Sequence, residues 1–101
     1  MIPEVLRYRL SDANRSSFET AYRDALVHLR ASPHFLGMEI LRSQKEPQNV
    51  LVVLRWDSET GHLEGFRKSE HFPPFLALVR PFLNDLVEME HYATIVQVSI
   101  P

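Results

Sequence analysis

The chain has 101 residues, a length that suits one domain over residues 1–101, and its hydrophobic fraction of 45% is ordinary for a folded protein. It has 11 basic and 13 acidic residues, interspersed, so no basic block is available to bind nucleic acid. With no cysteine, disulfides, thiolate nucleophiles and cysteine-ligated metals are excluded. No run of about 18 apolar residues predicts a membrane span, and MIPEVLRYRL lacks the pattern of a secretory signal, so we expect a cytoplasmic protein without a membrane partner.

The first third of the chain predicts a strand followed by a helix. Residues 4–10 alternate, with Leu6, Tyr8 and Leu10 on one face, which is the period of a β-strand. The stretch SDANRSS is rich in residues that cap helices. Apolar residues then recur at i, i+3, i+4 spacing and predict one amphipathic helix to about residue 31; they are Phe18, Ala21, Tyr22, Ala25, Leu26 and Leu29.

The middle of the chain predicts two strands, over residues 38–43 and 50–56. The stretch SPHFLG ends the first helix, because proline cannot continue its hydrogen bonds and disfavours a helical residue before it. The strand VLVVLRW is apolar at almost every position, which is typical of a strand covered on both sides. On adjacent strands, Arg55 can pair with Glu39.

The last part of the chain predicts two helical pieces and a final strand. Asp57 or Ser58 can cap a helix over about residues 59–69. The stretch HFPPF interrupts it, and a second piece follows over residues 75–86, which Pro81 should kink or divide. Residues 87–99 alternate as a strand that carries apolar residues on both faces towards its C-terminal end, with Val87, Met89 and His91 sharing one face.

The resulting order is β-α-β-β-α-β, the order of the ferredoxin-like α+β fold. That fold has a four-stranded antiparallel sheet with both helices on one face. Several strands here are apolar on both faces, and no further element is left to cover the second face. We therefore predict a homodimer in which two sheets pack face to face.

The segment PHFLGMEILRSQKEPQNVLVVLRWDSETGHLEGFRKSEHFPPF resembles the antibiotic biosynthesis monooxygenase (ABM) family, of the dimeric α+β barrel group. The resemblance lies in a proline–hydrophobic–glycine stretch before a strand, an apolar strand that ends in W-x-S, and a helix that ends in FRKSEHF. It covers nearly the whole chain. Some members oxidise polycyclic aromatic compounds with molecular oxygen and without metal or flavin, some degrade haem, and others transform small metabolites.

Two patterns within the family can be compared with this sequence. The haem-degrading members carry an asparagine, a tryptophan and a histidine where this chain has Tyr8, Phe66 and Leu76. Because leucine cannot ligate iron, the resemblance disfavours haem degradation. The quinone-forming members carry a tryptophan that Trp56 matches, whereas their asparagine falls near Val52.

Trp56, His62 and His71 are the candidate catalytic residues. Trp56 ends a buried strand, where its indole could stack on a flat substrate and its N–H could bond a phenolic oxygen; an aromatic core residue is the alternative. His62, six residues on, could accept a phenolic proton if its pKa is near neutral, or it could be a solvated helix histidine. His71 flanks the FPPF break and could line the same pocket or lie in a loop.

Candidate substrate-binding residues are spread over the strands and the second helical region. Each has an ordinary structural role as its alternative: core packing for the aromatic residues, and a core or interface histidine for His91. They are Tyr8, Arg42, Phe66, Phe72 and His91. The five histidines show no metal-binding spacing, and no phosphate-binding or dinucleotide motif occurs, so we expect neither a metal nor another cofactor.

These observations lead to three functional hypotheses. The first is an ABM-like, cofactor-independent monooxygenase that acts on a small aromatic or polyketide-like compound. The second is a non-catalytic dimer that binds a small ligand in the same pocket. The third, which the sequence favours least, is haem binding.

Overall fold

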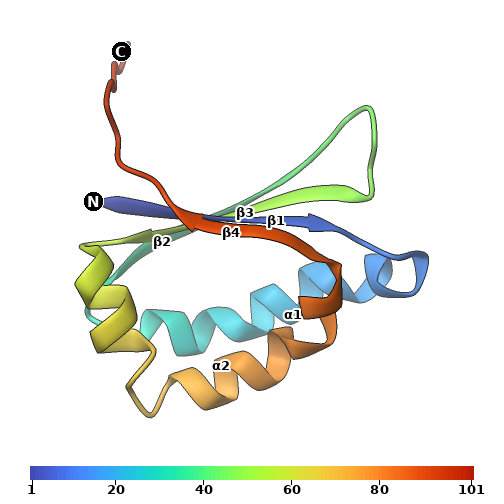
Figure 1. Cartoon of the computed structure of the whole chain (residues 1–101), viewed down its shortest axis with the longest axis horizontal. Coiled ribbons are helices and arrows are strands. Elements are labelled where there is room, and N and C mark those ends of the chain that lie inside the picture. Colours follow the sequence, from blue (N-terminus) through green and yellow to red (C-terminus); the bar gives the residue numbers. More distant parts are fainter.

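A computed structural model describes residues 1–101 and confirms the ferredoxin-like order. The elements are β1 (Ile2–Arg9), α1 (Asp12–Arg30), β2 (Phe35–Arg42), β3 (Asn49–Trp56), the π-helix η1 (Gly61–Phe66), α2 (Phe72–Val79), the 3-10 helix η2 (Arg80–Asp85) and β4 (Leu86–His91). The strands form one antiparallel sheet in the order β2-β3-β1-β4. Both α-helices lie under the same face of this sheet (Figure 1).

The core fills the layer between the sheet and the helices. The buried face of α1 presents Phe18, Tyr22, Ala25 and Leu29, the residues whose spacing predicts the helix. In the centre of this layer the Tyr8 and Tyr22 hydroxyls share a hydrogen bond of 2.6 Å. Burying two hydroxyls is tolerated because each satisfies the other.

The second helical region is divided into three parts. Ser58 caps its start as expected, since its hydroxyl accepts the N–H of Gly61 at 2.8 Å. The π-helix η1 closes with the bond from the Arg67 N–H to the His62 carbonyl at 3.0 Å. Helix α2 begins at Phe72 rather than at residue 75, because two prolines fit in a first turn that needs no N–H donors. At the predicted breaking point, Pro81, the chain continues as η2.

The final strand is shorter than the prediction of residues 87–99. Strand β4 ends at His91, and the last ladder contact is the Tyr92 N–H donating to the Pro3 carbonyl at 2.9 Å. Its only neighbour, β1, begins at Ile2, so residues beyond Tyr92 have no strand to pair with. They extend away from the sheet (Figure 1), leaving Ile95 93% and Ile100 88% exposed.

A register shift in β4 corrects the predicted face of Val87. Between the pairs Arg7–Glu88 and Tyr8–Leu86, β4 has one residue more than β1, which is the geometry of a β-bulge. Leu86 therefore packs against the core, while Val87 is 63% exposed. Met89 and His91 do share one face of the sheet, and across the ladder they pair with Leu6 and Glu4 of β1, respectively.

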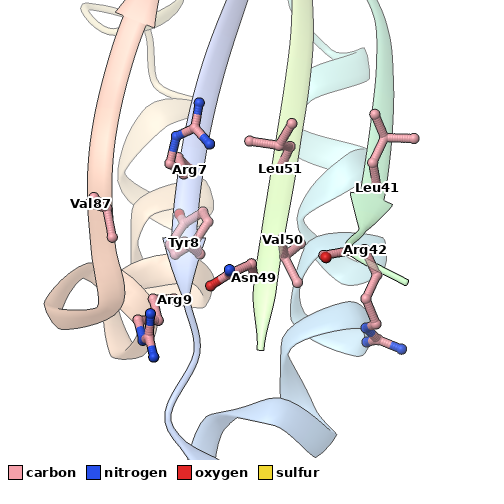
Figure 2. Close-up of a pocket in the computed structure, with 10 residues that line it drawn as sticks. Arg7, Tyr8, Arg9, Leu41, Arg42, Asn49, Val50, Leu51 and Val87 are labelled. Carbon is pink, nitrogen blue, oxygen red and sulfur yellow. The ribbon is translucent and has the colours of Figure 1, made fainter. Parts of the chain in front are cut away.

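No segment of the chain covers the other face of the sheet (Figure 1). Figure 2 looks onto part of that face, where a groove of about 510 Å³ is bordered by residues of all four strands, including Arg7, Leu41, Leu51 and Val87. Charged pairs also lie there, among them the predicted Arg55–Glu39 pair at 3.7 Å. The face is thus mixed, with apolar and charged residues side by side. None of the helices combines the length and apolar character needed to cross a bilayer.

Candidate active site

The register of the sheet brings three functional side chains to one end of its helix-covered face. Glu4 on β1 lies directly opposite His91 on β4, so the two side chains project on the same side. On the other neighbour, β3, Trp56 lies diagonally from Glu4. The Trp56 Nε1–H donates to Glu4 Oε1 at 3.1 Å, and both side chains are buried, with 0% and 2% exposed respectively.

The π-helix η1 places His62 above this end of the sheet. Its ring stacks on Trp56 with centroids 4.3 Å apart and an angle of 13° between the planes. His62 Nδ1 is hydrogen bonded to His91 Nε2 at 2.8 Å, and His62 Nε2 lies 3.6 Å from Glu4 Oε1. We call the four side chains Glu4, Trp56, His62 and His91 the polar corner.

His34, in the loop between α1 and β2, holds η1 in this position. Its ring lies where side chains on Gly61 and Gly65 would be, since a Cβ on Gly61 would come within 2.8 Å of its Nδ1 and one on Gly65 within 2.5 Å of its Cδ2. The same Nδ1 is hydrogen bonded to Asp57 Oδ2 at 2.9 Å. Two glycines one turn apart thus allow η1 to approach the loop closely, and His62 lies between them.

Three side chains of the polar corner, Glu4, Trp56 and His62, line a cavity of about 330 Å³ between the helices and the sheet. This volume falls within the range of small-molecule pockets. The walls are almost entirely apolar, with Arg67 as the only cation. They comprise Glu4, Leu6, Tyr8, Tyr22, Leu54, Trp56, His62, Phe66, Arg67, Phe72, Phe75, Leu76, Val79, Leu83, Leu86 and Met89.

Burial shifts the pKa values of Glu4 and His62 in opposite directions. It raises the pKa of Glu4 above its usual value, although the Trp56 hydrogen bond and the charges of His91 and Arg67 oppose the shift. For His62, burial and then the charges of Arg67 and His91 lower the pKa to about 3. The expectation of a near-neutral pKa for His62 is therefore wrong, and the ring is a neutral imidazole at physiological pH.

Most of the predicted site residues gather at this cavity. Tyr8, Phe66 and Phe72 line it together with Trp56 and His62. His91 contacts His62 from the strand end. The indole N–H of Trp56 is bound to Glu4 and one indole face is covered by His62, so Trp56 supports the polar corner instead of presenting a free N–H. The Tyr8 hydroxyl is likewise occupied, by Tyr22.

Two predicted residues, Arg42 and His71, belong neither to the cavity walls nor to the polar corner. Arg42 pairs with Val50, whereas Trp56 is six residues further along β3, which corresponds to about 20 Å at the rise of a strand. Its exposed side chain borders the groove on the open face (Figure 2). His71 precedes α2 and is not among the residues that line the cavity.

Three residues of the site were missed by the sequence analysis: Glu4, His34 and Arg67, the cation that lines the cavity. Glu4 continues the alternation of Leu6, Tyr8 and Leu10 by one step, so a carboxylate in phase with a buried stripe was a usable signal. His34 carried no such signal. Its role depends on a close approach of two segments, which only the folded structure reveals.

Together, the fold and the cavity define a ferredoxin-like α+β protein with a largely apolar cavity on the helical side of its sheet. The sequence model of the family described as antibiotic biosynthesis monooxygenase matches residues 1–78, and the chain belongs to this family. Over 92 residues it is 23% identical to the uncharacterised protein YczJ of Bacillus subtilis strain 168, a match that covers 91% of this chain and 97% of YczJ.

Solved structures are similar over nearly the full length. The cofactor-independent oxygenase SnoaB from Streptomyces nogalater matches with a TM-score of 0.72 at 17% identity, covering 99% of this chain and 96% of its own. Rv0793 from Mycobacterium tuberculosis matches with a TM-score of 0.74 at 18% identity, covering 97% and 98%. At such identities these likenesses establish the fold alone.

Proposed function

We propose that this protein is a cofactor-independent monooxygenase that acts on a small aromatic or polyketide-like compound. The observation that carries the proposal is the polar corner, since Glu4 and His62 are the only potential proton acceptors on the walls of an otherwise apolar cavity. Family membership and the similarity to SnoaB support the same class of reaction.

The geometry supports a proton transfer that does not end on His62. With its proton on Nδ1, His62 donates to His91 Nε2 and leaves Nε2 free to accept a proton from the substrate. Because burial keeps the pKa of His62 at about 3, a proton held there is unstable, and transfer through Nδ1 to His91 relieves it. Glu4, close to His62 Nε2, is a second acceptor within reach of the same substrate atom.

The chemistry after deprotonation needs no external reductant. A CH₂ group flanked by aromatic rings or carbonyls loses a proton, and the resulting carbanion reduces molecular oxygen and bonds to it as a hydroperoxide. Loss of water, using the proton taken earlier, leaves a carbonyl, so that CH₂ and O₂ become C=O and H₂O. Arg67, the one cation lining the cavity, stabilises the anion, and the apolar walls exclude bulk water.

Oxygen uptake with anthrone, a tricyclic ketone with an acidic CH₂ group, tests the proposal. We expect uptake above the uncatalysed rate in protein treated with a chelator and desalted. His62→Asn should lower this uptake at least tenfold, because the neutral acceptor is lost. The control His28→Asn, on α1 and outside the cavity, should retain it. Uptake that is equal in the two variants would remove His62 from the mechanism.

A ligand-binding function without catalysis is the alternative. It is favoured by the hydrogen bonds within the polar corner, since the Trp56 N–H and the Tyr8 hydroxyl are already bound to protein groups. Saturable binding of anthrone under nitrogen, with no uptake when oxygen is admitted, would support this function and refute the oxygenase.

We further propose that the protein works as a homodimer through the open face of the sheet. The support is the pattern on that face, where Val5 and Val53 pair across β1 and β3 beside exposed Leu41 and Val87. The apolar segment after β4 extends away from its own sheet, and a second copy would offer it a surface to pack on (Figure 1).

A further inference from the structure

Glu4, His62 and His91 bring a carboxylate and two imidazoles together inside the protein. One potential ligand atom from each lies within 4.8 Å of the other two. They come from three elements, β1, η1 and β4, so their convergence is a property of the fold rather than of a local sequence motif. Glu4 and His62 are buried, and His91 is half-buried.

Two imidazoles and one carboxylate form a ligand set that binds zinc with one position left open. Tetrahedral ligation at about 2.0–2.2 Å separates the ligand atoms by roughly 3.4 Å. The nitrogens of His62 and His91 are 2.8 Å apart, so they need to separate by well under 1 Å. Because Glu4 and His62 line the cavity, the open position would face it.

The surroundings also orient these side chains as a metal site requires. The Trp56 N–H fixes one oxygen of the Glu4 carboxylate, and a carboxylate has a second oxygen available for ligation. Stacking on Trp56 fixes the plane of the His62 ring. A shift of the His62 proton from Nδ1 to Nε2 would free Nδ1 for the ion and direct an N–H towards Glu4.

We propose that Glu4, His62 and His91 bind a divalent first-row metal ion such as zinc at the polar corner of the cavity. The site goes beyond the proposed oxygenase reaction, which does not use the ion. A bound ion would occupy the Glu4 carboxylate and would keep the His62 proton on Nε2, so neither group could accept the substrate proton. Zinc should therefore inhibit oxygen uptake and a chelator should restore it.

Arg67 gives the proposal an electrostatic test. It lines the cavity, and its charge acts on both Glu4 and His62. A positive charge there opposes a second cation, so Arg67→Met should bind zinc several-fold more tightly than the native protein. A purely adventitious site elsewhere on the surface would not respond in this way.

The decisive experiment is a calorimetric titration of metal-free protein with zinc chloride, repeated with cobalt chloride to record the visible bands of a tetrahedral ion. We expect one ion per chain. His91→Asn and His62→Asn should each weaken binding at least tenfold, as removal of a ligand requires, whereas His71→Asn and His28→Asn should not. If Glu4→Gln fails to fold, these two histidine variants decide the question, with circular dichroism confirming their fold.

Affinity unchanged in His62→Asn and His91→Asn, or no binding at 1 mM zinc, would overturn the site. This titration contains no substrate, so its failure leaves the oxygenase proposal standing. Conversely, absence of oxygen uptake would refute the oxygenase without affecting the metal site.

Discussion

Replacing Gly65 by alanine tests how the fold positions His62. An added Cβ would lie 2.5 Å from Cδ2 and 2.7 Å from Nε2 of His34, closer than van der Waals contact allows. Overpacking of this kind costs about 1–3 kcal/mol. Alanine regains about 1 kcal/mol of helix propensity over glycine. The net expectation is a loss of up to about 2 kcal/mol in the free energy of unfolding.

Gly37 provides the matched control for this variant. A Cβ on Gly37 meets nothing within 4 Å, and the residue lies inside β2. Gly37→Ala should therefore raise stability by about 0.5–1 kcal/mol, because glycine loses more conformational freedom on folding. The two Gly→Ala changes are thus predicted to act with opposite signs in urea unfolding followed by the fluorescence of Trp56, the only tryptophan.

A double-mutant cycle identifies the contact responsible. In a His34→Ala background the clash is gone, so Gly65→Ala should become neutral or stabilising, with a coupling energy equal to the cost of the clash, about 1–3 kcal/mol. If Gly65→Ala costs the same in both backgrounds, His34 is not what limits the approach of η1. The reasoning about the position of His62 would then be refuted.

Three further predictions concern the core, the polar corner and the open face. All three tyrosines have raised pKa values, to about 12 for Tyr8 and Tyr92 and well above the usual range for Tyr22, so phenolate absorbance at 295 nm should stay low at pH 10–11. The folded state keeps the protons of Tyr8 and Tyr22 to a higher pH than the unfolded state does. Their contribution to the free energy of unfolding is therefore complete below about pH 10 and is lost as the pH rises through 12. Ordinary titration of these two tyrosines near pH 10 would contradict the buried pair. Trp56→Phe removes the donor to the buried Glu4 carboxyl and should lower stability by about 1–3 kcal/mol in urea unfolding followed by circular dichroism, and a smaller loss in a Glu4→Leu background would confirm the contact. In sedimentation at micromolar concentration the native protein should behave as a dimer of the 11.8 kDa chain. Val53→Glu on the open face should dissociate the dimer, whereas the control Val27→Glu on the exposed side of α1 should not. A native species of 11.8 kDa alone would refute the dimer.

Much of the fold could be predicted from the sequence, because the spacing of apolar residues within a single helix or strand is a local pattern. The apolar spacing from Phe18 to Leu29 predicted the buried face of α1, and the apolar run up to Trp56 predicted β3. The end of β4 was not predictable in this way. Residues 93–99 have the composition of a strand, but a strand also needs a partner. Tyr92 already bonds to Pro3, and β1 starts at Ile2, so almost no residue of β1 is left for them to pair with.

The site was predictable only in part, for a related reason. Trp56 and His62 were found because chain position and residue type were informative, and both line the cavity. Glu4 and His91 are 87 positions apart in the chain, and only strand pairing makes them neighbours. His71 and Arg42 have suitable side chains, but neither lines the cavity, which no local sequence pattern revealed.

The central claim is that a small aromatic molecule binds in the helix-side cavity against the polar corner. A ¹H–¹⁵N NMR titration with 2-naphthol tests it directly, because the single tryptophan gives a single indole signal. Our account predicts a saturable shift of the Trp56 indole N–H in the native protein and in Leu41→Phe, which fills the groove on the open face instead. The shift should disappear in Leu76→Phe, which fills the cavity. An unmoved indole signal, with saturable shifts confined to Leu51 and Val87, would contradict the account.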